Sequence, residues 1–284
     1  MAIGAVNSTL QNSILSNLNN FSNARSSSIK KLSSGFRINK ASDDAAGLAV
    51  AVRQEAKASA LSQASDNVST GLSMLNTADS GLNNISNMLS RAKELAVQSA
   101  DSALDSSSRQ AISAEFNAII DEVTRTADST EFGGQKLING DLSASSPDQA
   151  DIQAGDSNTS SDRININVIE GAAASQLGIN NADVSTVGGA QNAIDAIDSA
   201  IDNVSSIRAN VGATQNRLSF ANANLGASVE NITASVSNIR DVDFAAEVSN
   251  LARNQVGQKA SLIAIKTVNS NKSEMIGRLI NFKA

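Results

Sequence analysis

Residues 61–96 read LSQASDNVSTGLSMLNTADSGLNNISNMLSRAKELA. Their apolar residues recur in alternating steps of three and four, which is the spacing of a coiled-coil seam. The seam positions are Leu61, Ala64, Val68, Gly71, Leu75, Ala78, Leu82, Ile85, Leu89, Ala92 and Ala96. Only Gly71 breaks the apolar rule. At about 1.5 Å per residue the seam is about 50 Å long, and it predicts a long helix over roughly 43–100.

A second seam lies far downstream and predicts a helix over roughly 190–240. Its positions are Ile194, Ile197, Ile201, Val204, Arg208, Val211, Gln215, Leu218, Asn222, Leu225, Val229, Ile232, Val236 and Ile239. The polar exceptions Arg208, Gln215 and Asn222 are seven residues apart and share one heptad position. Either they lie inside the seam, where they fix the register at a cost in stability, or they lie at its edge facing solvent.

A shorter helix is predicted over 106–128, between the two seams. Its apolar residues Ile112, Phe116, Ile119 and Val123 step by four, three and four. The serines at 106–108 supply its expected N-terminal cap, because a serine hydroxyl accepts a backbone hydrogen bond there. The three helices share one core, so the predicted fold class is mainly α, a long antiparallel coiled-coil-like helical bundle.

The segment 133–189 differs from its surroundings in composition, and it predicts a small β-hairpin region in the bundle. It holds eight of the 17 glycines. Within it, Ile164, Ile166 and Val168 alternate with polar residues, which is typical of a half-buried strand. Residues 151–155 are the expected hairpin partner. The segment is too short for a large inserted domain.

Both ends of the chain carry an amphipathic helical pattern. The N-terminal stripe includes Leu10, Ile14, Leu18 and Phe21, and the C-terminal stripe includes Phe244, Val248 and Leu251. A single pair of helices buries little apolar surface and is marginally stable alone. We therefore expect these stripes to be covered by further partners, and the most available partners are other copies of the chain.

Composition excludes much chemistry. The chain has 284 residues and no His, Cys, Trp or Tyr. Zinc and copper sites of the usual kind need His or Cys, and Ser–His–Asp and Cys–His nucleophiles cannot be built. The net charge of −6 is spread along the chain, without a basic patch or an apolar run that could span a membrane. We expect no enzyme, no cofactor, no metal, no nucleic acid and no membrane partner.

Four charged residues gather where the first helix breaks: Arg37, Lys40, Asp43 and Asp44. Ser42 is the expected cap of the helix that follows, with both aspartates in its first turn, where the helix dipole favours them. The same charges could form pairs between copies of the chain. An acid–base catalytic pair would need a pocket and a partner group, and nothing in the sequence points to either.

At this point the sequence resembles the bacterial flagellins. The resemblance is carried by LSSGFRINKASDDAAGLAVA (32–51), NNISNMLSRAKELAVQSA (83–100), EFGGQKLINGD (131–141) and the run from Ala223 to Val256. It covers roughly 2–140 and 190–284. The C-terminal SNKSEMIGRLINFKA departs from the Leu-rich ending usual in the family.

The resemblance implies an architecture. Residues 1–41 and 243–284 would be the terminal helices of the inner tube (D0-like), and 42–242 the outer-tube domain (D1-like) with a short β/loop segment at about 133–189. The large variable D2/D3 insertion is absent, so the chain would be a minimal flagellin. Its function would be that of a structural subunit that self-assembles into the extracellular helical filament for swimming.

The resemblance also implies partners. These are other copies of the chain, an export chaperone on the C-terminal helix, the filament cap and hook-associated proteins, and an animal Toll-like receptor. Arg91, Leu95 and Glu115 match positions that this receptor recognises in flagellins. The N-terminus lacks the basic start and apolar core of a Sec signal, so export by the flagellar type III apparatus is expected.

Two alternatives remain open at the level of sequence. A hook–filament junction protein resembles flagellin at its ends as well. A binding module or receptor ligand, not built for long filaments, would share the same helices.

Overall fold

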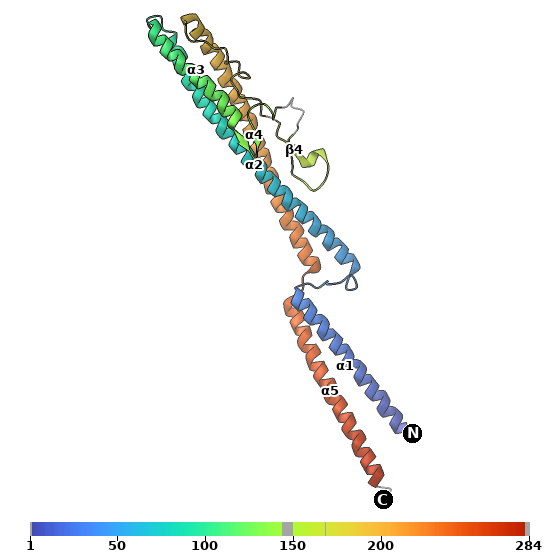
Figure 1. Cartoon of the computed structure of the whole chain (residues 1–284). Helices are drawn as coiled ribbons and strands as arrows, with labels where there is room; N and C mark the ends of the chain where they lie inside the picture. Colours follow the sequence, from blue (N-terminus) through green and yellow to red (C-terminus); the bar gives the residue numbers. More distant parts are fainter. Residues whose placement is uncertain (1, 144–149, 168, 282–284) are drawn as a thin grey trace. The chain divides into compact units, whose positions relative to one another are not determined.

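The computed structural model describes residues 2–143, 150–167 and 169–281, and the side chains of 8–143, 150–167 and 169–278. Five long helices dominate it (Figure 1): α1 (Ala2–Ser34), α2 (Ala45–Ser99), α3 (Ser106–Ser129), α4 (Val187–Arg240) and α5 (Phe244–Asn281). Two short antiparallel sheets accompany them. The mainly helical class with a small β-hairpin region is confirmed.

The chain forms two compact units. One combines residues 1–56 with 232–284, and the other consists of residues 57–231. In the first unit α1 and α5 lie side by side, so the two ends of the chain share one helix pair (Figure 1). In the second unit α3 runs alongside the parts of α2 and α4 that lie within residues 57–231 (Figure 1).

The predicted seam of α2 is confirmed in full, because every one of its eleven positions is buried. Its exception, Gly71, has a structural reason. A Cβ at Gly71 would lie 3.0 Å from Cγ1 of Ile152 and 3.5 Å from Cδ1 of Leu218. The missing side chain therefore admits both the hairpin and α4 against the same point of α2.

As far as Leu225, the predicted seam of α4 is correct in one heptad position and wrong by one residue in the other. The last four predicted positions, Val229, Ile232, Val236 and Ile239, are only half-buried. Ile197, Val204, Val211, Leu218 and Leu225 are buried as predicted. The second buried row is Ala193, Ala200, Ile207 and Thr214, not the row of Ile194, Ile201, Arg208 and Gln215. The helix is rotated so that the polar groups stay partly hydrated, because burying a guanidinium costs more than turning an apolar neighbour inward.

The displaced polar residues lie at the edge of the seam, and each bonds across to α2. Arg208 Nε donates to Asp79 at 2.9 Å, and Gln215 Nε2 donates to Asn76 at 3.1 Å. Ser65 Oγ lies 2.6 Å from Asn222 Oδ1. Residue numbers rise along α2 as they fall along α4, so the two helices are antiparallel.

Helix α3 closes the core of the second unit, with two differences from the prediction. Its cap is Asp105, whose carboxylate accepts the backbone N–H of Ser108 at 2.6 Å, and the serines at 106–108 lie inside the first turn. A carboxylate is favoured there because it also meets the positive end of the helix dipole. In the apolar row Ile120 is buried in place of Ile119, beside Phe116 and Val123.

The predicted hairpin is present but short. Strand β3 (Asp151–Gln153) pairs antiparallel with β4 (Arg163–Asn165), with Ile152 opposite Ile164. Ile164 and Ile166 are buried, and Val168 lies outside the described residues. The sequence prediction missed a second hairpin, β1 (Glu131–Phe132) with β2 (Gln135–Lys136). Gly133 and Gly134 form its turn, with φ of 61° and 86°, a conformation that glycine adopts without strain.

Replacing Phe116 by alanine should destabilise the chain by about 3–5 kcal/mol, because a fully buried ring leaves a cavity. Urea unfolding followed by circular dichroism measures this loss. The exposed neighbour Asn117→Ala is the control and should change stability by less than about 0.5 kcal/mol. Equal effects of the two substitutions would contradict the position given to α3.

Candidate assembly surfaces

The two ends of the chain are tied together at a short backbone bridge in the first unit. Phe36 and Asp241 form an isolated antiparallel β-bridge. Arg37 N donates to the carbonyl of Arg240 at 2.6 Å, and Val242 N donates to the carbonyl of Gly35 at 2.9 Å. Gly35, with φ of 77°, ends α1 and turns the chain toward this bridge.

Arg240 holds the bridge together with its side chain. Its guanidinium lies over the ring of Phe36, 4.1 Å from the centroid, and donates to Glu55. Sequence reasoning missed Phe36, Glu55 and Arg240. The available signal was the break in the helical pattern at 241–243, opposite the break at Gly35, although neither break shows which side chains meet.

The predicted charged cluster is divided between two local tasks. Asp44, not Ser42, caps α2: its Oδ1 accepts the N–H of Gly47 at 2.9 Å, and its carbonyl accepts the N–H of Leu48 at 3.0 Å. Asp43 Oδ2 accepts the N–H groups of Asn39 and Lys40, each at 3.0 Å. These two hydrogen bonds, with the charges of Lys31 and Lys40, hold the pKa of Asp43 below its ordinary value of 3.8.

Arg37 and Lys40 have different surroundings. The guanidinium of Arg37 donates to the carbonyl of Ile239, so this side chain also joins the two chain ends. The ammonium of Lys40 forms no ion pair with any side chain that the structure describes. The role of these four residues in contacts between copies stays a prediction.

The apolar stripes of α1 and α5 are covered by each other only in part. Ile14, Leu18, Phe21 and Leu251 are half-buried. The ring of Phe21 lies against Gly257, where a Cβ would come within 2.6 Å of it. Four residues further along α1, Arg25 donates to Gln258 at 3.0 Å. The first partner of each stripe is thus the other end of the same chain.

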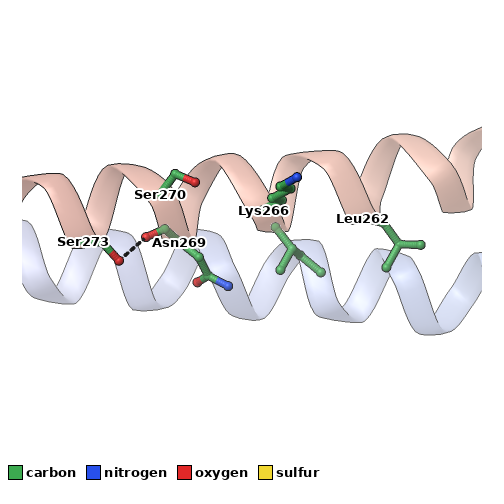
Figure 2. A pocket seen from close by; sticks show the side chains of 6 residues that line it. Leu262, Lys266, Asn269, Ser270 and Ser273 are labelled. Atoms are coloured by element: carbon green, nitrogen blue, oxygen red, sulfur yellow. Dashed lines mark hydrogen bonds between the residues drawn. The ribbon is translucent and has the colours of Figure 1, made fainter.

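Much of the apolar surface of this helix pair remains uncovered. Among the predicted stripe residues, Leu10, Phe244 and Val248 are 50%, 56% and 53% exposed. Further along α5, Val256 and Ile263 are exposed by 67% and 66%. Figure 2 shows an open groove on α5 lined by Leu262, Ile265, Lys266, Asn269, Ser270 and Ser273. Exposed apolar residues in such number on one helix are typical of an association surface.

The receptor-like residues in the second unit are only partly at the surface. Arg91 Nη2 lies 2.8 Å from Glu115 on α3, and Arg91 Nη1 lies 2.9 Å from Glu94. Hydrogen bonding to Glu115 raises the pKa of Arg91. Leu95 is buried, at 1% exposure. The structure therefore joins Arg91 to Glu115 on the outside and places Leu95 in the core beneath them.

Neither a metal site nor a membrane span emerges from the described residues. They contain no group of three or more acidic, His or Cys side chains that could hold a metal ion. No helix in the described part of the chain is long and apolar enough to cross a membrane.

Long paired helices, termini joined in one helix pair and an uncovered apolar face define a class of self-associating helical proteins. Comparison with known proteins makes this specific. The profile of the bacterial flagellin N-terminal helical region matches residues 6–142, and that of the flagellin C-terminal helical region matches residues 194–279. The chain belongs to the bacterial flagellin family.

Comparison with individual proteins gives the same family. A flagellin of Listeria innocua is 36% identical over 263 residues, which cover 89% of this chain and 90% of that protein. A flagellin of Clostridium tyrobutyricum is 43% identical over 131 residues, 46% of this chain but only 35% of that longer protein. A solved chain from Vibrio parahaemolyticus, provisionally assigned as a flagellar hook-associated protein, is 13% identical with a TM-score of 0.57. The match covers 70% of this chain and all of the solved chain. At this low identity it shows the fold alone.

Two Listeria flagellins match at 36% identity over 90% of their own length, which supports the filament subunit over the junction protein and over an unpolymerised binding module. The family is structural, and the chain is a short member without a large variable domain. It is a structural subunit of the flagellar filament, which lies outside the cell.

Replacing Arg240 by alanine should loosen the bridge, because the contact with Phe36 and the pair with Glu55 are lost together. Amide hydrogen exchange at Arg37 and Val242 should become about tenfold faster, which corresponds to about 1.4 kcal/mol of local stability. Arg253→Ala, which removes an exposed arginine of α5, should leave both amides unchanged. Unchanged exchange in the Arg240 variant would contradict the role given to this side chain.

The turn at Asn39–Asp43 should depend on pH. Because the pKa of Asp43 is lowered by folding, its contribution to stability is complete above about pH 3.8 and is lost as the pH falls through the lower folded pKa. The amide NMR signals of Asn39 and Lys40 should titrate with a midpoint below 3.8. This titration should be absent in Asp43→Asn, and a midpoint above the ordinary value would refute the assignment.

Proposed function

We propose that the two ends of the chain form the inner layer of the filament and that the α2–α3–α4 unit forms its outer layer. This corresponds to a D0-like layer of residues 1–41 and 243–284 and a D1-like layer of 42–242. The observation that supports it most is the uncovered apolar surface of α5, where Val256 and Ile263 are two-thirds exposed. Neighbouring copies would bury these side chains, and burial of each contributes about 1.5–3 kcal/mol.

Head-to-tail contacts between identical subunits build an open helical polymer when their rotation does not close a ring. The junction residues Arg37, Lys40, Asp43 and Asp44 would lie among such contacts. Before assembly the apolar face of α5 would be a liability for the free subunit. An export chaperone on the C-terminal helix would cover it until the chain leaves the cell through the flagellar type III apparatus.

Further partners follow from the same surfaces. The filament cap and hook-associated proteins would meet subunits at the two ends of the polymer and present matching helical faces. An animal Toll-like receptor would meet the outer face at Arg91 and Glu115, while Leu95 would act from beneath by supporting this face. In the described structure both charged residues are exposed and already paired with each other.

The proposal is tested by making the α5 face polar. Val256→Asn and Ile263→Asn should each raise the critical concentration for filament growth by about tenfold or more, because the apolar burial between copies is lost. Light scattering and electron microscopy measure growth, and circular dichroism checks that the free subunit keeps its helices. The matched control Gln255→Asn keeps a polar residue on the same helix and should polymerise normally. Normal filaments from both the Val256→Asn and the Ile263→Asn variant would overturn the inner-layer assignment.

A further inference from the structure

A small polar pocket lies between α1 and the loop that joins it to α2, inside the unit of residues 1–56 and 232–284. It encloses about 230 Å³. One wall is a single face of α1, on which Ser26, Ser27, Lys30 and Lys31 follow at helical spacing. The other wall is the loop after α1, which contributes Lys40 and Asp43.

The loop wall is held in place by its own hydrogen bonds. Gly35 ends α1 in a left-handed conformation, and Asp43 accepts the N–H groups of Asn39 and Lys40. The side-chain amide of Asn39 also donates to the hydroxyl of Ser34 at 2.8 Å. The backbone that carries Lys40 is therefore fixed opposite α1, and the pocket is already formed in the single chain.

The charge in the pocket is not balanced. Three ammonium groups, of Lys30, Lys31 and Lys40, line it with one carboxylate, that of Asp43. None of these lysines forms an ion pair with a side chain in the described residues. One oxygen of Asp43 is already occupied by the two backbone N–H groups. The pocket thus has an excess of positive charge in a chain whose net charge is −6.

We propose that this pocket receives a carboxylate side chain from a neighbouring copy of the chain. The inference rests on the proposed function, since it requires a filament. Copies that each carry a net charge of −6 repel one another, so close packing needs places where a positive site meets an acidic group. The lysines supply that charge, and the hydroxyls of Ser26 and Ser27 supply neutral donors for the carboxylate oxygens.

The test removes two pocket lysines and compares them with two lysines that already have partners. The variant Lys30→Gln/Lys40→Gln is compared with Lys57→Gln/Lys136→Gln, in which the lost ammonium groups were paired with Asp156 and Glu131. Both variants lose the same charge. The pocket variant should raise the critical concentration for seeded filament growth by about three- to tenfold, and the control by less than about twofold.

Salt provides a second readout. Added salt screens the proposed attraction as well as the general repulsion between copies, so the critical concentration of the unmodified chain should rise with ionic strength relative to that of the pocket variant, which lacks this attraction. Critical concentrations or salt dependences that are equal in the pocket and control variants would overturn the inference. Failure of the unmodified chain to form filaments would instead refute the proposed function.

Inorganic phosphate separates a carboxylate of a second copy from a free anion as the occupant. Growth of the unmodified chain in phosphate-free buffer, with the pocket variant still impaired, supports the carboxylate. Growth that begins only when millimolar phosphate is added, at constant ionic strength, would show that a free anion fills the pocket and would overturn the proposal.

Discussion

The hydrogen bonds between residues 35–37 and 240–242 hold together two points that are more than 200 residues apart in the chain. Once they are joined, the α1–α5 pair does not have to bear the entropy of closing that long loop by itself. The pairing then needs only a modest interface, in which Phe21 lies against Gly257 and Arg25 reaches Gln258. A small interface leaves most of α5 uncovered, as the proposed contact between copies through this helix requires.

The charged residues near this bridge fall into two groups, those engaged inside the chain and those that remain available for the proposed contacts between copies. Asp43, Asp44, Arg37 and Arg240 are all engaged inside the chain, mostly with backbone groups. The lysines beside them are not. Cationic groups therefore remain at the surface while the neighbouring acids are occupied, although acids outnumber bases in the chain as a whole.

Much of this could be predicted from the sequence, and the failures concern choices that local spacing leaves open. The α2 seam was predictable because apolar residues repeat without competition from polar ones. In α4 the polar residues at 208, 215 and 222 fit the heptad equally well, and only the partner helix decides which row turns inward. The caps were misplaced by one or two residues because adjacent Ser and Asp can serve equally. The contact of Arg240 with Phe36 and Glu55 joins distant segments, and a pattern of local spacing carries no information about it.

The row of polar residues along the edge of α4 bears on how α2 and α4 find their alignment. Apolar heptads resemble one another, so displacing α4 by seven residues along α2 would still bury one apolar row against another. The polar neighbours would not match in the same way. A displaced Arg208 would face Leu72 or Ser86 in place of Asp79, while Ile201 or Gln215 would face the orphaned carboxylate. These polar side chains therefore select one alignment of α2 and α4, whereas the apolar core alone would allow several.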